Sequence, residues 1–291
     1  MKLYIIGNGF DLAHGFNTSY IHYRNYIKSN LRFHPKWEQV LDYYPDDYNF
    51  WSDIEYNVCN FNIELYFSLK KLYLFGLLDD LLRQIHSSFE YFLLDTESKM
   101  FSSKPVFNLD KDSFFLSFNY TSTLEDLYGV PHENIIYVHN DISGPAMDII
   151  YNIPNHTPCI IGHSPISNEY SHHNDNRLSG DVEYNDFVKS TVKQCQEIIQ
   201  KLRIDNFLIS HKEDFEEVVF YGFSFSISDK PYIQLIFSII ESNNIKCKIY
   251  YKVEDGSTNN ECIDNFRNKL ALMGINSNDI EFVNCDITKT I

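Results

Sequence analysis

The stretch LYIIGNGFDLAHG, residues 3–15, predicts how the rest of the chain is arranged. Its apolar residues run straight into Gly7 and Gly9, and a helical pattern follows, so we expect a buried strand that ends in a tight turn. The two glycines allow the backbone to approach a ligand, and the start of the helix favours an anion such as phosphate. The dinucleotide fingerprint is incomplete, because Leu12 stands at its third glycine position. We expect Asp11 to cap the helix, to meet a ribose hydroxyl or to act in chemistry.

The composition excludes several classes of protein. A chain of 291 residues with 44% hydrophobic content is expected to form one domain with insertions. Its formal charge of −16 argues against nucleic acid and against anionic membranes as partners. The six cysteines include no C-x-x-C pair, which is typical of a reducing compartment, so we expect a cytoplasmic protein. No apolar run approaches the roughly 18 residues of a membrane span, and the N-terminal run is too short for a signal peptide.

Short apolar runs alternate with helical patterns along the chain. This alternation predicts an α/β fold, a doubly wound and mostly parallel sheet of about six strands that is Rossmann-like. Ser122 and Glu125 have the spacing of a capping box, and Ser228 or Asp229 is expected to cap a later helix. After the first strand, the expected strands are residues 113–118, 135–138, 217–221, 247–253 and 281–283.

Two segments are expected to stand apart from the sheet within a single domain, residues 1–291. Residues 61–100 carry leucines and aromatic residues at helical spacing, which predicts a helical insertion that forms a lid or a partner surface. Residues 144–180 are rich in proline, asparagine and histidine without periodicity. A loop of this length in a compact domain is usually functional, so we expect an active-site loop there.

Polar residues follow several of the expected strands directly. Asn119 comes after the second strand and His139 after the third, while Gly222 and Ser224 follow the fourth. Ligands of open α/β sheets bind beyond the carboxyl ends of the strands, so these residues and the first glycine turn are expected to converge on one cleft. His139, with an ordinary pKa of about 6.5, is suited to accept a proton near neutral pH.

Six motifs together resemble the AbiH proteins of bacterial abortive infection against phage. They are IIGNGFDLAHG, WSDIE, SFNYTSTLE, VHND, IGHS and YGFSFSISDKPY, and the resemblance spans nearly the whole chain. A more distant similarity is to the sirtuin-like NAD-binding fold, in which a T-T-N-Y-D-x-x-x-E segment follows the second strand. Asn119, Tyr120 and Glu125 match that segment in type and spacing, whereas Thr121 replaces its aspartate and Asn140 replaces the glycine after the histidine.

The resemblance implies a set of functional residues and NAD as the substrate or ligand, with no cofactor required. Asn119 and His139 would handle the ribose next to nicotinamide. Gly7, Gly9 and Ser224 would hold the phosphates. Apart from the resemblance, we expect Asp11 and His163 to be further catalytic residues, the alternative for His163 being a loop residue packed on Pro165. The full set of residues that we predict to bind the nucleotide is Gly7, Asn8, Gly9, Phe10, Thr121, Gly222, Ser224 and Asp229.

Three functions remain open at this point. The first is an anti-phage effector that hydrolyses NAD or a related nucleotide. The second is a non-catalytic nucleotide sensor that binds a protein partner, or a second copy of itself, through the helical insertion. The third is a metal-dependent nuclease or phosphohydrolase, although the net charge argues against a nucleic-acid substrate. Its ligands and bases would be Asp11, Asp53, Glu55, His139 and His163, and a further metal-binding alternative is His172, His173 and Asp175.

Overall fold

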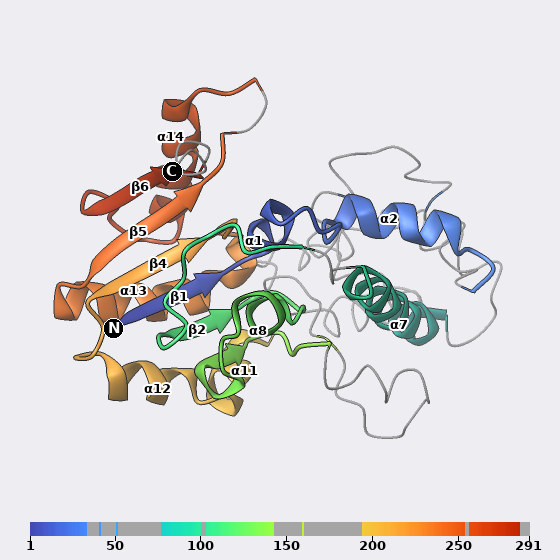
Figure 1. The fold of residues 1–291 in the computed structure, drawn as a ribbon, viewed down its shortest axis with the longest axis horizontal. Helices are drawn as coiled ribbons and strands as arrows, with labels where there is room; N and C mark the ends of the chain where they lie inside the picture. Colours follow the sequence, from blue (N-terminus) through green and yellow to red (C-terminus); the bar gives the residue numbers. More distant parts are fainter. Residues whose placement is uncertain are drawn as a thin grey trace, which may run out of the picture. The chain divides into compact units, whose positions relative to one another are not determined.

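Two compact units make up the chain in this computed structural model. The sheet unit contains residues 1–17, 97–144 and 194–291, and the helical unit contains residues 18–96 and 145–193. The expected boundaries of the helical insertion and of the active-site loop stay predictions, because much of both segments lies outside the described residues. The structure describes residues 1–33, 41, 51, 77–99, 103–142, 159, 194–253 and 256–285 (Figure 1).

Six parallel strands in the order β3-β2-β1-β4-β5-β6 form the centre of the sheet unit (Figure 1). Every neighbouring pair is parallel. The strand order reverses between β1 and β4, as it does in a doubly wound sheet, so the predicted α/β fold is confirmed and a Rossmann-like description is consistent with it. The strands are β1 (Lys2–Ile6), β2 (Phe114–Ser117), β3 (Ile135–Tyr137), β4 (Glu217–Tyr221), β5 (Lys246–Tyr251) and β6 (Ile280–Asn284).

Helices connect successive strands of this sheet. The longest are α13 (Lys230–Asn243) and α14 (Asn259–Leu272). The apolar face of α13 is buried as its helical pattern predicts, and Thr258 and Glu261 form a capping box at the start of α14. The shorter elements are α1 (Gly9–Ala13), α8 (Thr123–Tyr128), η2 (His132–Asn134), α11 (Cys195–Lys201), α12 (Ile204–His211) and η4 (Ile227–Asp229).

The predicted capping box at the start of α8 is wrong. Ser122 is the N-cap residue, but its side chain makes no capping bond to the helix and instead donates to Asp126 Oδ2 at 2.6 Å. The Glu125 carboxylate accepts from the Tyr137 hydroxyl and contacts His132 Nδ1. A local partner on α8 therefore occupies the Ser122 side chain, and partners on β3 and η2 occupy Glu125, so neither side chain caps the helix.

Aromatic side chains from the central strands β1, β2 and β4 pack together in one cluster of the core. The rings of Tyr4 and Phe115 stack at 4.9 Å between centroids, and Phe10 lies 5.3 Å from Phe107. Phe10 is completely buried and belongs to the same cluster as Tyr221. Burial of these large rings fixes the first turn of the chain against the sheet.

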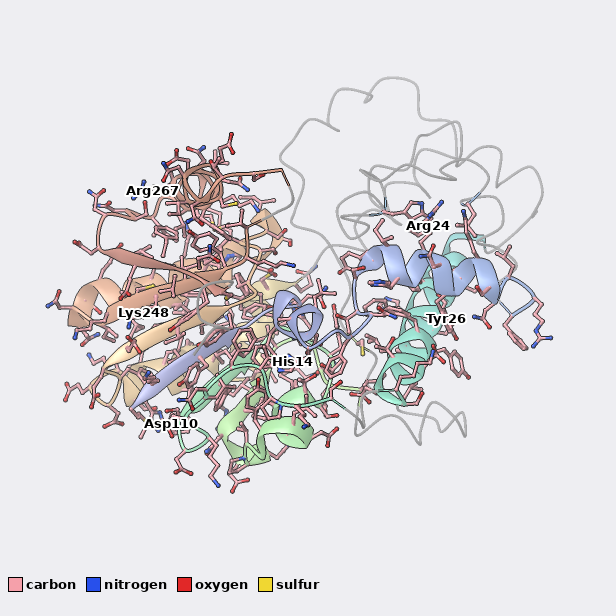
Figure 2. The ribbon with its side chains drawn as sticks, turned by 45° about the horizontal axis from the view of Figure 1, so that its top comes forward. His14, Arg24, Tyr26, Asp110, Lys248 and Arg267 are labelled. Atoms are coloured by element: carbon pink, nitrogen blue, oxygen red, sulfur yellow. The ribbon has the colours of Figure 1, made fainter. Side chains whose placement is uncertain are left out.

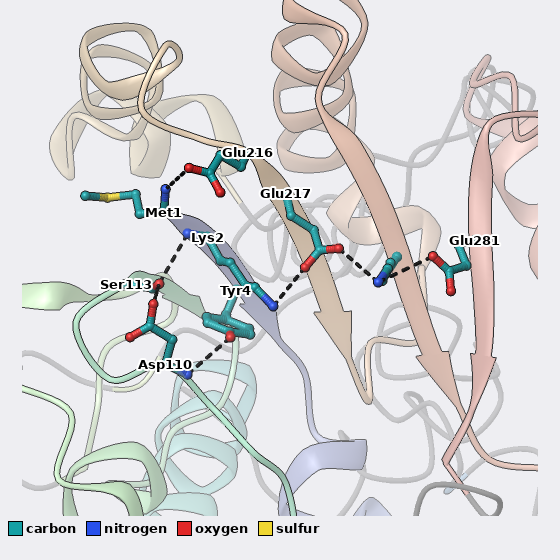
Figure 3. Close-up of polar contacts among 9 residues, drawn as sticks. Met1, Lys2, Tyr4, Asp110, Ser113, Glu216, Glu217 and Glu281 are labelled. Carbon is teal, nitrogen blue, oxygen red and sulfur yellow. Dashed lines mark hydrogen bonds and ion pairs between the residues drawn. The ribbon is translucent and has the colours of Figure 1, made fainter.

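Charged residues link the strands at their amino ends (Figure 3). Glu217 on β4 pairs with Lys2 on β1 at 3.0 Å and with Lys248 on β5 at 3.1 Å. Lys248 also pairs with Glu281 on β6 at 3.4 Å. Burial raises the pKa of Glu217, but the hydrogen bonds from the two lysines outweigh burial and leave that pKa below its ordinary value. This network ties four strands together at the edge opposite to their carboxyl ends.

The described part of the helical unit is built on α2 (Tyr20–Ser29) and α7 (Leu77–Glu97). Ser19 caps α2, because its side chain accepts from the backbone N–H of His22 at 3.3 Å. Tyr23 is buried, and its hydroxyl lies 2.6 Å from Ser88 Oγ on α7. The ring of Tyr26, labelled in Figure 2, also contacts α7, because it lies 5.8 Å from the ring of Phe92.

Within the ranges that the structure describes, none of the helices has both the length and the apolar character that crossing a membrane requires.

Candidate functional site

Asn119 and His139 lie at matching positions beyond neighbouring strands. Ser117 on β2 pairs with Tyr137 on β3, and each site residue comes two residues later. The pairing continues past the strands, because the Val138 N–H donates to Ser117 O at 2.8 Å. Adjacent strands are about 5 Å apart, so the two backbones are close neighbours at the carboxyl edge of the sheet. Their side chains are only 5% and 4% exposed.

The Asp11 carboxyl group is held by three side chains that follow β2. Thr121 donates to Asp11 Oδ2 at 2.7 Å, and Thr123 donates to Asp11 Oδ1 at 2.8 Å. The Asn119 side chain forms a third hydrogen bond to this carboxyl group. Asp11 is 1% exposed, and its burial raises the pKa to about 6 although all three hydrogen bonds lower it. The residues after β1 and β2 therefore form one buried polar cluster.

This cluster has room for one additional proton. Thr121 Oγ1 and Thr123 Oγ1 are 3.0 Å apart, within hydrogen-bonding distance. When Asp11 is ionised, each hydroxyl has given its only hydrogen to the carboxylate, so no hydrogen lies between the two oxygens. When Asp11 is protonated, its hydrogen can go to one threonine and that threonine can donate to the other. A closed ring of hydrogen bonds thus accompanies the neutral acid.

Glu97 brings a second carboxyl group with a raised pKa to the same unit. Its Oε1 accepts from the Ser122 N–H at 2.9 Å and lies 3.3 Å from Ser122 Oγ. Burial raises the pKa of Glu97 to about 7, assisted by the negative charges of Asp126 and Asp11 and opposed by the Ser122 hydrogen bonds. Sequence reasoning missed Glu97 and Thr123. The three consecutive hydroxyl residues of SFNYTSTLE, residues 121–123, were the available signal for Thr123.

His139 lies among aromatic rings and beside a carboxylate. The Phe118 ring meets it edge to face at 5.4 Å, and the Tyr120 ring lies 5.7 Å away. His139 Nε2 is 4.0 Å from Asp229 Oδ1. Asp229, one of the two residues predicted to cap α13, is its N-cap residue, but its side chain makes no capping bond to the helix and lies near the histidine instead.

Asn140 fills the glycine position after the histidine. Its φ of +63° lies in the left-handed region, which glycine adopts most readily and asparagine tolerates better than most residues.

The glycines after β1 and β4 bring two turns into direct contact. The Gly9 N–H donates to Gly222 O at 2.9 Å, and the Gly7 N–H donates to Tyr221 O at 3.0 Å. A Cβ atom on Gly222 would lie 2.1 Å from the Phe10 nitrogen. The close approach of the two turns is thus sufficient to explain why glycine is needed at these positions, whether or not a ligand binds there. Phosphate binding by Gly7, Gly9 and Gly222 stays a prediction, and two of the amides that would serve it already bond to protein carbonyls.

The other expected nucleotide-binding residues are spread over different environments. Asn8 is exposed at the end of β1, and Ser224 is exposed beyond β4. The Ser224 carbonyl accepts from Lys269 Nζ at 2.9 Å. Phe10 packs in the core, so its side chain anchors the glycine turn after β1 to the sheet.

The metal-dependent alternative stays open. Among the residues with a described placement, no group of three or more histidine, cysteine, aspartate or glutamate side chains could hold a metal ion. The other residues of that hypothesis lie outside the described part of the chain, as does the second catalytic histidine, His163. These undescribed residues are Asp53, Glu55, His163, His172, His173 and Asp175.

Comparison with known proteins gives one match. The model of a family described as "Bacteriophage abortive infection AbiH" matches residues 3–77 and 66–251. These ranges include the first glycine turn, the segments after β2 and β3 and the turn after β4. Neither the curated proteins nor the solved structures that were compared gave a match. The similarity to sirtuin-like proteins therefore stays a prediction.

Proposed function

This chain belongs to the AbiH family, whose role is abortive infection against bacteriophage, and from that premise we propose that it binds and hydrolyses NAD or a related nucleotide. The reaction would take place beyond the carboxyl ends of β1, β2 and β3, where ligands of doubly wound sheets bind. The observation that carries the proposal is the pair of buried polar side chains, Asn119 and His139, at matching positions on neighbouring strands.

These two residues suit cleavage of an N-glycosidic bond. Water attacks C1′ of the ribose while the bond to the nicotinamide nitrogen breaks, and nicotinamide leaves with the bonding electron pair. His139 accepts the proton that the water releases, and Asp229 stabilises the resulting imidazolium. Asn119 holds the water or a ribose hydroxyl in place. Holding the reacting groups in this way supplies much of the rate enhancement in such reactions.

Burial of the pair supports an effector that is inactive before infection. Asn119 and His139 are 5% and 4% exposed, so a nucleotide reaches them only after the atoms that cover them move. An enzyme that depletes NAD must be silent in a healthy cell, and a site that opens on infection meets that need.

The test is the NAD content of phage-infected bacteria that express the chain. We expect NAD to fall and free nicotinamide to rise with the wild type but not with Asn119→Ala or His139→Ala. The matched controls are Asn260→Ala on α14 and His132→Ala, whose side chain is 71% exposed, and both should behave as the wild type. Wild-type protection against phage with an unchanged NAD pool would contradict the proposal.

A nucleotide sensor is the second candidate, because the Thr121 hydroxyl is already bonded to Asp11. In the predicted resemblance to sirtuin-like proteins, Thr121 stands at the position of an aspartate, and its donated hydrogen is not available to nicotinamide. A sensor would bind nucleotide without cleaving it and recruit a partner, or a second copy, through residues 61–100, of which α7 is described. Calorimetry with NAD would then show binding, while no nicotinamide appears.

A further inference from the structure

The orientation of the Asn119 side-chain amide follows from its contact with Asp11. An asparagine amide has a donor end, Nδ2, and an acceptor end, Oδ1, and either can face a given neighbour. An ionised carboxylate only accepts, and both Asp11 oxygens already receive threonine hydroxyls. The hydrogen bond between Asn119 and Asp11 therefore uses Nδ2 as the donor.

The acceptor end of Asn119 is left without a donor. Among the residues that the structure describes, none donates to Asn119 Oδ1, although that atom is buried. More than nine in ten buried polar groups in folded proteins have a hydrogen-bond partner. The backbone of Asn119 is also fixed, because its N–H donates to Ser117 Oγ at 3.2 Å. The oxygen is thus held in place with its acceptor capacity unused.

We infer that Asp11 is a positioning residue, which orients Asn119 so that Oδ1 accepts a hydrogen bond from a hydroxyl group of the ligand. This inference rests on the proposed function and specifies the ligand chemistry at the same site. Oδ1 accepts from a ribose hydroxyl, but it gains nothing from a phosphate, a carbonyl or an ether oxygen. The site should therefore prefer a ribosyl compound over its deoxy analogue.

Asp11 acts through Asn119 and does not touch the ligand itself. It is 1% exposed, and three protein donors surround its two oxygens. Thr121 and Thr123 hold the carboxyl group from the side of β2, so the orientation of Asn119 depends on residues from both turns. Under this inference Asp11 has a positioning role, whereas the catalytic role expected from the sequence stays a prediction.

The first experiment examines the ligand-free wild-type protein by NMR. The Asn119 side-chain amide signal, identified by its loss in Asn119→Ala, should shift as Asp11 titrates near pH 6. Three side chains, Thr121, Thr123 and Asn119, contact Asp11 directly. Glu97 also titrates, and its charge and that of Asp11 influence each other. Glu97→Gln is therefore the control, and in this variant the shift of the Asn119 signal with pH should remain. A signal that does not change between pH 5.5 and 7.5, or that titrates equally in Asp11→Asn, would overturn the inference.

The second experiment measures ligand discrimination by calorimetry with the full chain. We expect NAD to bind about tenfold or more tightly than an analogue that lacks one hydroxyl of the nicotinamide ribose, because the analogue leaves Oδ1 buried and unpaired. Thr121→Ser should keep this ratio, whereas Thr121→Val and Asp11→Ala should reduce it towards one.

The two experiments separate this inference from the proposed function. Equal binding of NAD and both single-deoxy analogues would overturn the inference and leave hydrolysis standing. Binding with the expected discrimination, but without release of nicotinamide in infected cells, would support the inference and remove hydrolysis. If no nucleotide bound at all, the proposed function would fall, and with it the ligand role of Asn119, whatever the amide signal showed.

Discussion

Replacing Glu97 by glutamine should change how the stability of the protein depends on pH. The pKa of this carboxyl group rises from 4.5 to about 7 on folding, first because of burial and then because of its acidic neighbours. Between these two pKa values the folded protein holds a proton that the unfolded chain has released. Stability therefore falls as pH rises through this range and stays low above it.

The expected magnitude follows from the width of that range. Each pH unit at which the folded state holds one more proton changes the free energy of unfolding by about 1.4 kcal/mol. Between pH 5.5 and 7, Glu97 should therefore lower the free energy of unfolding of the wild type by about 2 kcal/mol. Glu97→Gln cannot release this proton, yet its amide oxygen can still accept from the Ser122 N–H.

Urea unfolding followed by circular dichroism at pH 5.5, 6.5 and 7.5 measures this effect. Relative to the wild type, Glu97→Gln should gain about 2 kcal/mol between the lowest and the highest pH. Glu213→Gln, which removes an exposed carboxylate, is the control and should follow the wild type. Parallel pH dependence of the wild type and Glu97→Gln would refute the reasoning, because it would mean that Glu97 titrates alike in both states.

Two further substitutions test the fold around the site. Gly222→Ala should lower the free energy of unfolding by at least about 3 kcal/mol, because its Cβ would meet a backbone nitrogen at 2.1 Å and its φ is +59°. Gly274→Ala has a φ of +84° with no atom within 4 Å, so thermal unfolding should show a loss of only about 1 kcal/mol; equal losses would contradict the interlocked turns. Glu217→Gln should cost about 1 to 2 kcal/mol near pH 7 in urea unfolding, because it weakens the bonds to Lys2 and Lys248. Since the pKa of Glu217 is lowered, this difference should disappear as pH falls below 4.5, and a constant difference would argue against the ion pairs.

The positions of the strands along the chain and their parallel pairing could be predicted from the sequence. Apolar runs that end in glycine, asparagine or histidine marked the strands, and their alternation with helical patterns implied parallel pairing. Parallel pairing then placed Asn119 and His139 at the same edge, which the register of β2 and β3 confirms. These inferences succeed because they depend on local patterns and on one rule of topology.

The partners of individual polar residues could not be predicted in this way. Ser122 and Glu125 have capping spacing, but Ser122 bonds to Asp126 one turn along the same helix, and Glu125 accepts from Tyr137 on β3. Glu97 stands in a helical segment whose pattern gave no reason to relate it to the segment after β2. The glycines at 7, 9 and 222 indicated a close backbone approach, yet nothing in their spacing showed that the two turns approach each other. Such contacts depend on the packing of segments far apart in the chain.

A structure of the full chain with ADP-ribose bound tests the central claim most directly. The account predicts a ribose hydroxyl within hydrogen-bonding distance of Asn119 Oδ1, with His139 on the same ribose and the Asn119 amide nitrogen still on Asp11. A ligand bound elsewhere on the sheet unit, with Asn119 and His139 buried as they are now, would contradict it.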